Sequence, residues 1–216
     1  VDISEPAEGY TDTDIGYYLE LDNYATSDED NHYISMDYEN ATVTDINGET
    51  RQFVPAEYSI KNDLYSQNQI DFIDKYLNNL FKIVYEACEN GKYYKFDENY
   101  DLVDSDVTTA EEAVSNVMDI DSVRDMYILY EIVHDYDCGE GSFYMCVDLS
   151  KDSKCPKLKF TSPWDFNWAY NDSTEKYYAG AFTDKNFVAK KGDRSNPWFI
   201  ILCKQDWFMA TVKEKW

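Results

Sequence analysis

The stretch YILYEIVHDYDCGEGSFYMCVD, residues 127–148, decides how this sequence is interpreted. Its first part continues an apolar stripe with helical spacing, so we predict a helix that begins at Asp121. An acidic loop with two glycines follows at residues 134–141. The aromatic and apolar residues Phe143–Asp148 then predict a strand.

A second predicted strand, Lys157–Thr161, follows a Lys/Asp/Ser turn and leads into the sequence PWDFN at 163–167. Two carboxylates, Asp137 and Asp165, therefore stand at the two ends of one hairpin. Because a hairpin brings its ends together, these side chains could converge, as a general base and a metal-holding carboxylate must. An Asp at a loop end is also common as a cap or turn residue, so the pair alone leaves both interpretations open.

The order of these elements matches the C-lobe of a protein kinase, where a helix, a loop with a catalytic Asp, a hairpin and a magnesium-holding Asp follow one another. In kinases the loop also supplies an Asn five residues after its Asp. Here Ser142 occupies that position relative to Asp137, and Asp165-Phe166 occupies the position of the metal-holding pair. His134 precedes the loop, and we interpret it as a helix-end histidine favoured by the helix dipole.

Residues 127–148 together with PWDFNWAYN at 163–171 resemble the CotH kinase family of spore-coat proteins. That family typically shows a helix, Asn-x-Asp, a short loop, an aromatic strand and Pro-Trp-Asp-x-Asp. GYYLELD at 16–22 resembles its Gly-Tyr-x-Leu-Glu-x-Asp strand, and NPWFIILCKQDWFMATVKEKW at 196–216 resembles its closing helices. The resemblance covers nearly the whole chain and is most specific at the Trp-Asp motif.

The resemblance implies an atypical protein-kinase-like fold that uses ATP with Mg²⁺ or Mn²⁺ to phosphorylate Ser or Thr of secreted or coat proteins. It places the protein outside the cell or on a bacterial cell or spore surface. Carried over position by position, Asp137 and the neighbouring Asp135 are catalytic, and Trp164 and Asp165 bind the nucleotide with its metal. The residues implied to hold the metal are Asp165, Asn167 and Ser142.

The sequence departs from the family pattern at several points. Asp135 stands where the family often has Asn, and Asn167 stands where it usually has a second Asp, which removes one anionic ligand. Nothing matches the family's upstream half, with its Arg-Gly-Asn-Ser strand and nucleotide-contacting Lys, and no Gly-rich phosphate loop is present. We therefore expect a C-terminal part of a CotH-like domain that lacks its N-lobe and is inactive alone. The alternative is a non-catalytic extracellular module whose exposed Tyr and Trp side chains bind carbohydrate or a protein partner.

The rest of the chain predicts one α+β domain. Residues 1–14 are interpreted as an acidic, poorly ordered lead-in, and residues 15–216 as a protein-kinase-like C-lobe with helices packed around the small catalytic hairpin. An amphipathic helix is predicted at 67–89 with Gly91 at its C-cap, followed by a polar connection at 92–109. The other predicted elements are an N-terminal β-rich meander of Gly16–Leu21, Tyr33–Tyr38, Thr42–Ile46 and Thr50–Val54, with a turn at Asn47-Gly48, and a final helix from Asn196 to Trp216.

Composition limits the partners. The 216 residues carry 43 Asp and Glu against 19 Lys and Arg, and the net charge of −24 repels nucleic-acid phosphates and favours a basic or Ser-rich protein partner. No apolar run is long enough to cross a membrane. Five cysteines leave at least one free thiol, although Cys146 and Cys155 could close a hairpin. Two histidines provide no metal-ligand cluster of the usual type.

Overall fold

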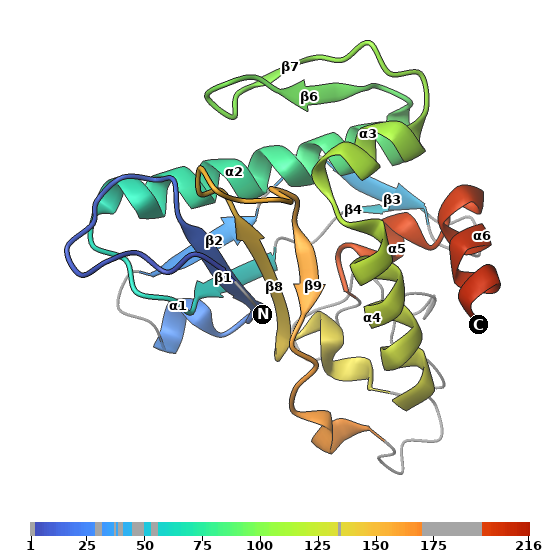
Figure 1. Cartoon of the computed structure of the whole chain (residues 1–216). Coiled ribbons are helices and arrows are strands. Elements are labelled where there is room, and N and C mark those ends of the chain that lie inside the picture. Colours follow the sequence, from blue (N-terminus) through green and yellow to red (C-terminus); the bar gives the residue numbers. More distant parts are fainter. Residues whose placement is uncertain are drawn as a thin grey trace.

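A computed structural model describes residues 3–28, 32–36, 38, 41–44, 50–52, 56–133, 135–169 and 196–216. Its centre is a five-stranded antiparallel sheet of order β2-β5-β1-β8-β9 (Figure 1). The central strand β1 pairs with β5 on one side and with β8 on the other. The five strands are β1 (Gly16–Leu21), β2 (Tyr33–Met36), β5 (Ala56–Ile60), β8 (Phe143–Asp148) and β9 (Lys159–Thr161).

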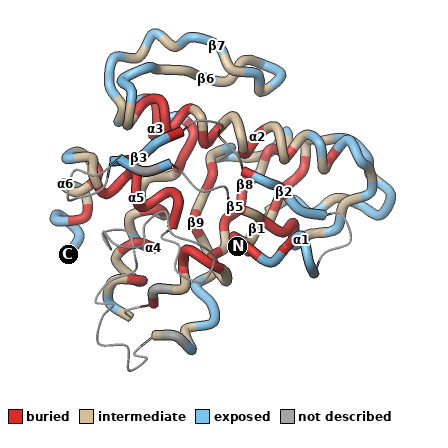
Figure 2. The backbone as a smooth tube through the Cα atoms, turned by 180° about the vertical axis from the view of Figure 1, so that it is seen from behind, coloured by how far each residue is buried: buried red, intermediate tan, exposed pale blue. Residues whose placement is uncertain are grey.

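The two faces of the sheet differ because side chains alternate along each strand. One face carries buried apolar residues such as Leu19, Phe143 and Tyr58, and the long helix α2 (Gln67–Tyr85) packs over it. Helix α2 begins with a capping box made by Ser66 and Gln69, and its buried stripe belongs to the same hydrophobic core. Figure 2 shows this buried material running from α2 into the strands. The opposite face of the sheet includes the partly exposed side chains of Tyr18, Glu20 and Tyr144.

Four further helices close the core beyond β9. They are α3 (Ala110–Val117), α4 (Ile120–Val133), α5 (Phe199–Leu202) and α6 (Asp206–Lys215). Trp198, at the start of α5, is fully buried and packs edge-on against Phe81 of α2, with 5.3 Å between ring centroids. Its Nε1 donates a hydrogen bond of 3.0 Å to Tyr58 Oη. The C-terminal segment is therefore joined to both the sheet and α2.

The remaining elements are small. A one-turn helix, α1 (Ala25–Asp28), follows β1. The strands β3 (Thr42–Thr44) and β4 (Thr50–Gln52) pair with each other. A hairpin of β6 (Tyr94–Phe96) and β7 (Leu102–Asp104) lies along the side of α2 away from the sheet (Figure 1), where Phe96 stacks on Tyr76 at 5.1 Å.

The N-terminal residues 3–14 were expected to be poorly ordered, but they are hydrogen-bonded to the folded body. The Gly16 backbone N donates to Ser4 O at 2.8 Å, and Ser4 Oγ donates to Asp148 Oδ2 at 3.0 Å. A Cβ on Gly16 would lie 2.6 Å from the Cβ of Ile3. This close approach explains why glycine stands at position 16.

The α+β class is confirmed, and several elements match their predicted positions. The strand Phe143–Asp148 has the predicted bounds, and Gly91 ends the long helix with a φ of 61°. The last turn of that helix, however, is a π-helix, η1 (Glu86–Asn90). The predicted Asn47-Gly48 turn lies outside the described residues.

Other predictions were wrong in detail. Tyr33 and its neighbours do not return beside β1, because β5 lies between β1 and β2. The polar connection at 92–109 contains the β6–β7 hairpin, and the expected last helix is two helices separated at residues 203–205. The second strand of the site hairpin begins at Lys159, two residues later than predicted. All five cysteines are free, so Cys146 and Cys155 are not bridged.

Candidate functional site

The acidic loop between α4 and β8 is built around Asp135. This residue precedes the short 3₁₀ turn η2 (Tyr136–Gly139), and its Oδ1 accepts a hydrogen bond of 3.2 Å from the backbone N of Asp137. Asp135 is only 2% exposed, whereas Asp137 is half-buried. Of the two predicted catalytic acids, Asp135 therefore shapes the turn, and Asp137 is the one more open to solvent.

Two buried asparagines hold this loop by its backbone. Asn23 donates from Nδ2 to Gly139 O at 2.9 Å, and its backbone N donates to Glu140 O at 3.0 Å. From the other end of the chain, Asn196 donates from Nδ2 to Cys138 O at 2.8 Å. From the sequence, Asn196 was predicted only as the start of the last helix and Asn23 had no predicted role, although each stands beside or within a stretch that resembles the CotH family.

The second loop follows β9 and carries the Trp-Asp motif. Asp165 adopts a left-handed conformation with φ 57° and precedes the 3₁₀ turn η3 (Phe166–Trp168). Ser162 in the same loop and Ser142 at the start of β8 also have positive φ, 50° and 54°. Such non-glycine conformations cost about 1–3 kcal/mol each and cluster at functional sites. Three of them thus lie where the two site loops join the β8–β9 hairpin.

Tyr130 of α4 ties the two loops together. Its ring packs against Phe166 at 5.4 Å, and its hydroxyl donates to Ser142 O at 3.4 Å. Burial, with contributions from Cys138 and the carboxylates of Asp135 and Asp137, raises the pKa of this phenol. The phenol therefore remains protonated and acts as a donor.

The carboxylates of the two loops interact. Burial, and then the negative charge of Asp165, raise the pKa of Asp135 to about 6, against the opposing effect of the hydrogen bond from the Asp137 backbone. The sequence predicted convergence of Asp137 with Asp165, whereas the interaction found here is between Asp165 and the neighbouring Asp135. A buried carboxyl whose pKa is raised by a second carboxylate marks a place that a divalent cation would stabilise.

The two loops offer few side chains that could hold a metal ion. Among the residues that the structure describes, no three His, Cys, Asp or Glu side chains are grouped to hold one. Mg²⁺, however, is usually bound through one or two carboxylates together with waters and substrate phosphates. Of the residues predicted to hold the metal, Asp165 provides an exposed carboxylate, Asn167 is exposed in the same loop, and Ser142 is half-buried in the other loop. Magnesium or manganese bound here would therefore depend on Asp165 together with phosphate oxygens and waters.

Trp164 and His134 were also singled out from the sequence. Trp164 is 64% exposed, so most of its ring faces solvent. His134 lies outside the described residues.

Within the described part of the chain, no helix is long and apolar enough to span a membrane. Comparison with protein-family models gives no match. Searches of curated proteins and of solved structures also give no significant match. The functional interpretation therefore depends on the geometry of the two loops and on the sequence resemblance.

Proposed function

We propose that this chain carries the magnesium–nucleotide site of a CotH-like protein kinase. The observation that supports it is that the two acidic loops meet at Tyr130, which contacts Phe166 of one loop and Ser142 of the other, while Asp165 contributes to the raised pKa of Asp135. Kinases use this element order to place a proton acceptor beside a metal-holding carboxylate. The left-handed backbone at Asp165 adds support, because such strain is kept where function requires it.

In this proposal the acids have separate roles. Asp137 is half-buried and accepts the proton of the substrate hydroxyl, while buried Asp135 fixes the turn through its hydrogen bond to the Asp137 backbone. Asp165 holds Mg²⁺ or Mn²⁺, with Asn167 and Ser142 beside it. The bound cation supplies charge neutralisation at the phosphate oxygens of ATP.

The substrate would be Ser or Thr of a secreted or coat protein. The net charge of −24 favours basic segments as partners and makes an unneutralised triphosphate a poor ligand. Nucleotide binding should consequently require the divalent cation. This requirement provides a direct test.

The test is calorimetric titration of the chain with ATP, with and without Mg²⁺. We expect binding only with Mg²⁺, and we expect Asp165→Asn to weaken it at least tenfold, or about 1.4 kcal/mol. Asp152→Asn is the matched control, because Asp152 is an exposed acid in the turn of the same hairpin. Binding without the metal, equal binding by the Asp165 variant, or no binding at all would refute the proposal.

A second candidate function is a non-catalytic extracellular module that binds carbohydrate or a protein partner. The exposure of Trp164 favours it, because an exposed indole offers a flat face for sugar rings. A glycan array probed with the chain and with Trp164→Ala tests this candidate. A signal lost in the variant would support it, and the absence of signal for the unchanged chain would count against it.

A further inference from the structure

The open face of the sheet carries a pair of stacked tyrosines. Tyr18 of β1 and Tyr144 of β8 have ring centroids 5.4 Å apart and ring planes 19° apart. They are diagonal neighbours across the strand pair, since Tyr18 is opposite Cys146 and Tyr144 is opposite Glu20. Both side chains are partly exposed, on the face that α2 does not cover.

Tyr144 of this pair lies toward the candidate metal site. Tyr144 is opposite Thr161, the last residue of β9, and Asp165 follows only four residues later. Burial, followed by the carboxylate of Glu20 and, less strongly, that of Asp165, raises the pKa of Tyr144. A ligand held at Asp165 could therefore extend along the sheet over Tyr144 and then Tyr18.

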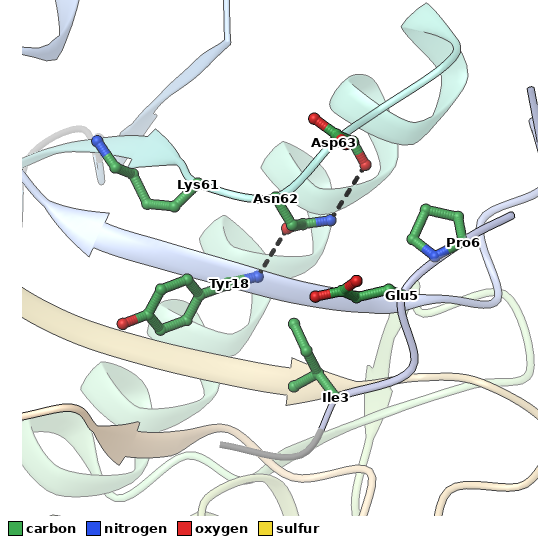
Figure 3. Close-up of a pocket in the computed structure, with 7 residues that line it drawn as sticks. All are labelled: Ile3, Glu5, Pro6, Tyr18, Lys61, Asn62 and Asp63. Carbon is green, nitrogen blue, oxygen red and sulfur yellow. Dashed lines mark hydrogen bonds between the residues drawn. The ribbon is translucent and has the colours of Figure 1, made fainter. Parts of the chain in front are cut away.

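Beyond Tyr18 the same face is hollowed by a cavity of about 220 Å³. Figure 3 shows the strand β1 behind it and the N-terminal segment on its other side. The side-chain amide of Asn62 fixes the wall, because it accepts from the Tyr18 backbone at 2.8 Å and donates to Gly16 O at 3.2 Å. The lining residues are Ile3, Glu5, Pro6, Tyr18, Lys61, Asn62 and Asp63.

The charges of the cavity favour a ligand group that presents hydrogen-bond donors. Glu5 and Asp63 provide carboxylate acceptors. The ammonium of Lys61 is paired with Glu20 at 3.1 Å and points away from Glu5 in Figure 3. Phosphates are therefore disfavoured in the cavity, whereas hydroxyl or amino groups can donate to its carboxylates.

We propose that the Tyr18–Tyr144 pair and the adjoining cavity form the nucleoside subsite of the nucleotide. In this arrangement the base stacks on the two rings, and ribose hydroxyls or an exocyclic amine donate to Asp63 or Glu5. The triphosphate extends in the opposite direction, to the cation at Asp165. This inference rests on the proposed nucleotide function, and it assigns which part of the nucleotide lies where.

The experiment compares two probes, Mg-ATP and Mg-tripolyphosphate, by calorimetry with the same chain. Only ATP carries the base and ribose, so we expect ATP to bind at least tenfold more tightly, as stacking on aromatic side chains contributes about 1–3 kcal/mol per base. Tyr144→Leu and, as a second variant, Tyr18→Leu should remove most of this preference and leave tripolyphosphate binding unchanged. Tyr33→Leu is the control, because Tyr33 is an exposed tyrosine at the edge of the same sheet.

Asp63→Asn tests the cavity itself. The side chain is exposed and lies beside Asn62, so the variant should fold, and it should weaken ATP binding several-fold without changing tripolyphosphate binding. Equal affinity of the unchanged chain for both probes would overturn the inference while leaving the metal–phosphate site standing. A preference for ATP that survives both tyrosine variants would also overturn it. Binding of neither probe would refute the proposed function together with this inference.

Discussion

Asn196 donates a hydrogen bond from Nδ2 to the backbone carbonyl of Cys138 at 2.8 Å, and both residues are buried. The Oδ1 of Asn196 accepts from the backbone N of Trp198 and of Phe199 at 3.0 and 3.3 Å. One side chain thus joins the acid loop to the start of α5, although the two are far apart in the sequence.

Replacing Asn196 with Ala should therefore destabilise the fold. The change leaves the Cys138 carbonyl and two backbone N–H groups without this partner, and we expect the free energy of unfolding to fall by about 3 kcal/mol. Urea unfolding followed by circular dichroism measures it. The control is Asn68→Ala on the exposed face of α2, which should stay within about 0.5 kcal/mol of the unchanged chain. Equal stability of the two variants would show that this hydrogen bond is not structural.

Gly16→Ala tests the close approach of the N-terminal segment to β1. The added Cβ would lie 2.6 Å from Ile3 Cβ and 2.9 Å from Ser4 N, so the segment must move. We expect a loss of about 1–3 kcal/mol in unfolding free energy, together with faster proteolysis within the first residues. Gly141→Ala is the control, since a Cβ there meets no atom within 4 Å. Unchanged proteolysis of Gly16→Ala would contradict the close packing.

The hairpin was predictable from the sequence because its signals are local. Residues 143–148 combine aromatic and apolar side chains between a glycine-containing loop and a charged turn, so the sequence indicates where the strand begins and where it ends. Its geometry then implied that Asp137 and Asp165 converge, and the interaction found is between Asp165 and Asp135, two residues before Asp137. The sequence could not decide which acid of the loop is buried, because a single 3₁₀ turn has no periodicity from which burial can be inferred.

The order of the strands and the buried asparagines that hold the acidic loop could not be predicted in the same way. The strand β5 lies between β1 and β2 only because of long-range pairing, to which the short sequence AEYSI gives no local clue. Asn23 and Asn196 are polar residues that the sequence alone would place at the surface. They are buried because the backbone carbonyls of the acid loop need donors once the chain is folded.

The hydrogen bond from Trp198 Nε1 to Tyr58 Oη connects the C-terminal segment with the middle of the sheet at 3.0 Å. Both side chains are fully buried, so Tyr58→Phe would leave the indole N–H without this acceptor. We expect a loss of about 1–3 kcal/mol, measured by urea unfolding. Tyr65→Phe, at an exposed tyrosine, should change the stability little. An equally stable Tyr58→Phe would indicate that the indole finds another partner.

The stability of the fold should depend on the ionisation of Asp135. Its carboxyl pKa is raised from 3.8 to about 6, so the folded chain holds the proton more strongly than the unfolded chain does. The stabilisation from this group is complete below about pH 4 and is lost as the pH rises through about 6. A shift of this size corresponds to about 3 kcal/mol.

In Asp135→Asn the side-chain oxygen can still accept the hydrogen bond from the Asp137 backbone N. The amide side chain, however, cannot ionise. Urea unfolding in buffer with EDTA should give nearly equal stabilities for variant and unchanged chain at pH 4. At pH 8 the variant should be more stable by about 2–3 kcal/mol, because only the unchanged chain must then bury a charge beside Asp165. For the control Asp152→Asn, at an exposed residue, the difference in unfolding free energy from the unchanged chain should be the same at pH 4 and pH 8. A constant difference in stability for Asp135→Asn as well would mean that burial and Asp165 do not raise the pKa of Asp135 in the folded chain.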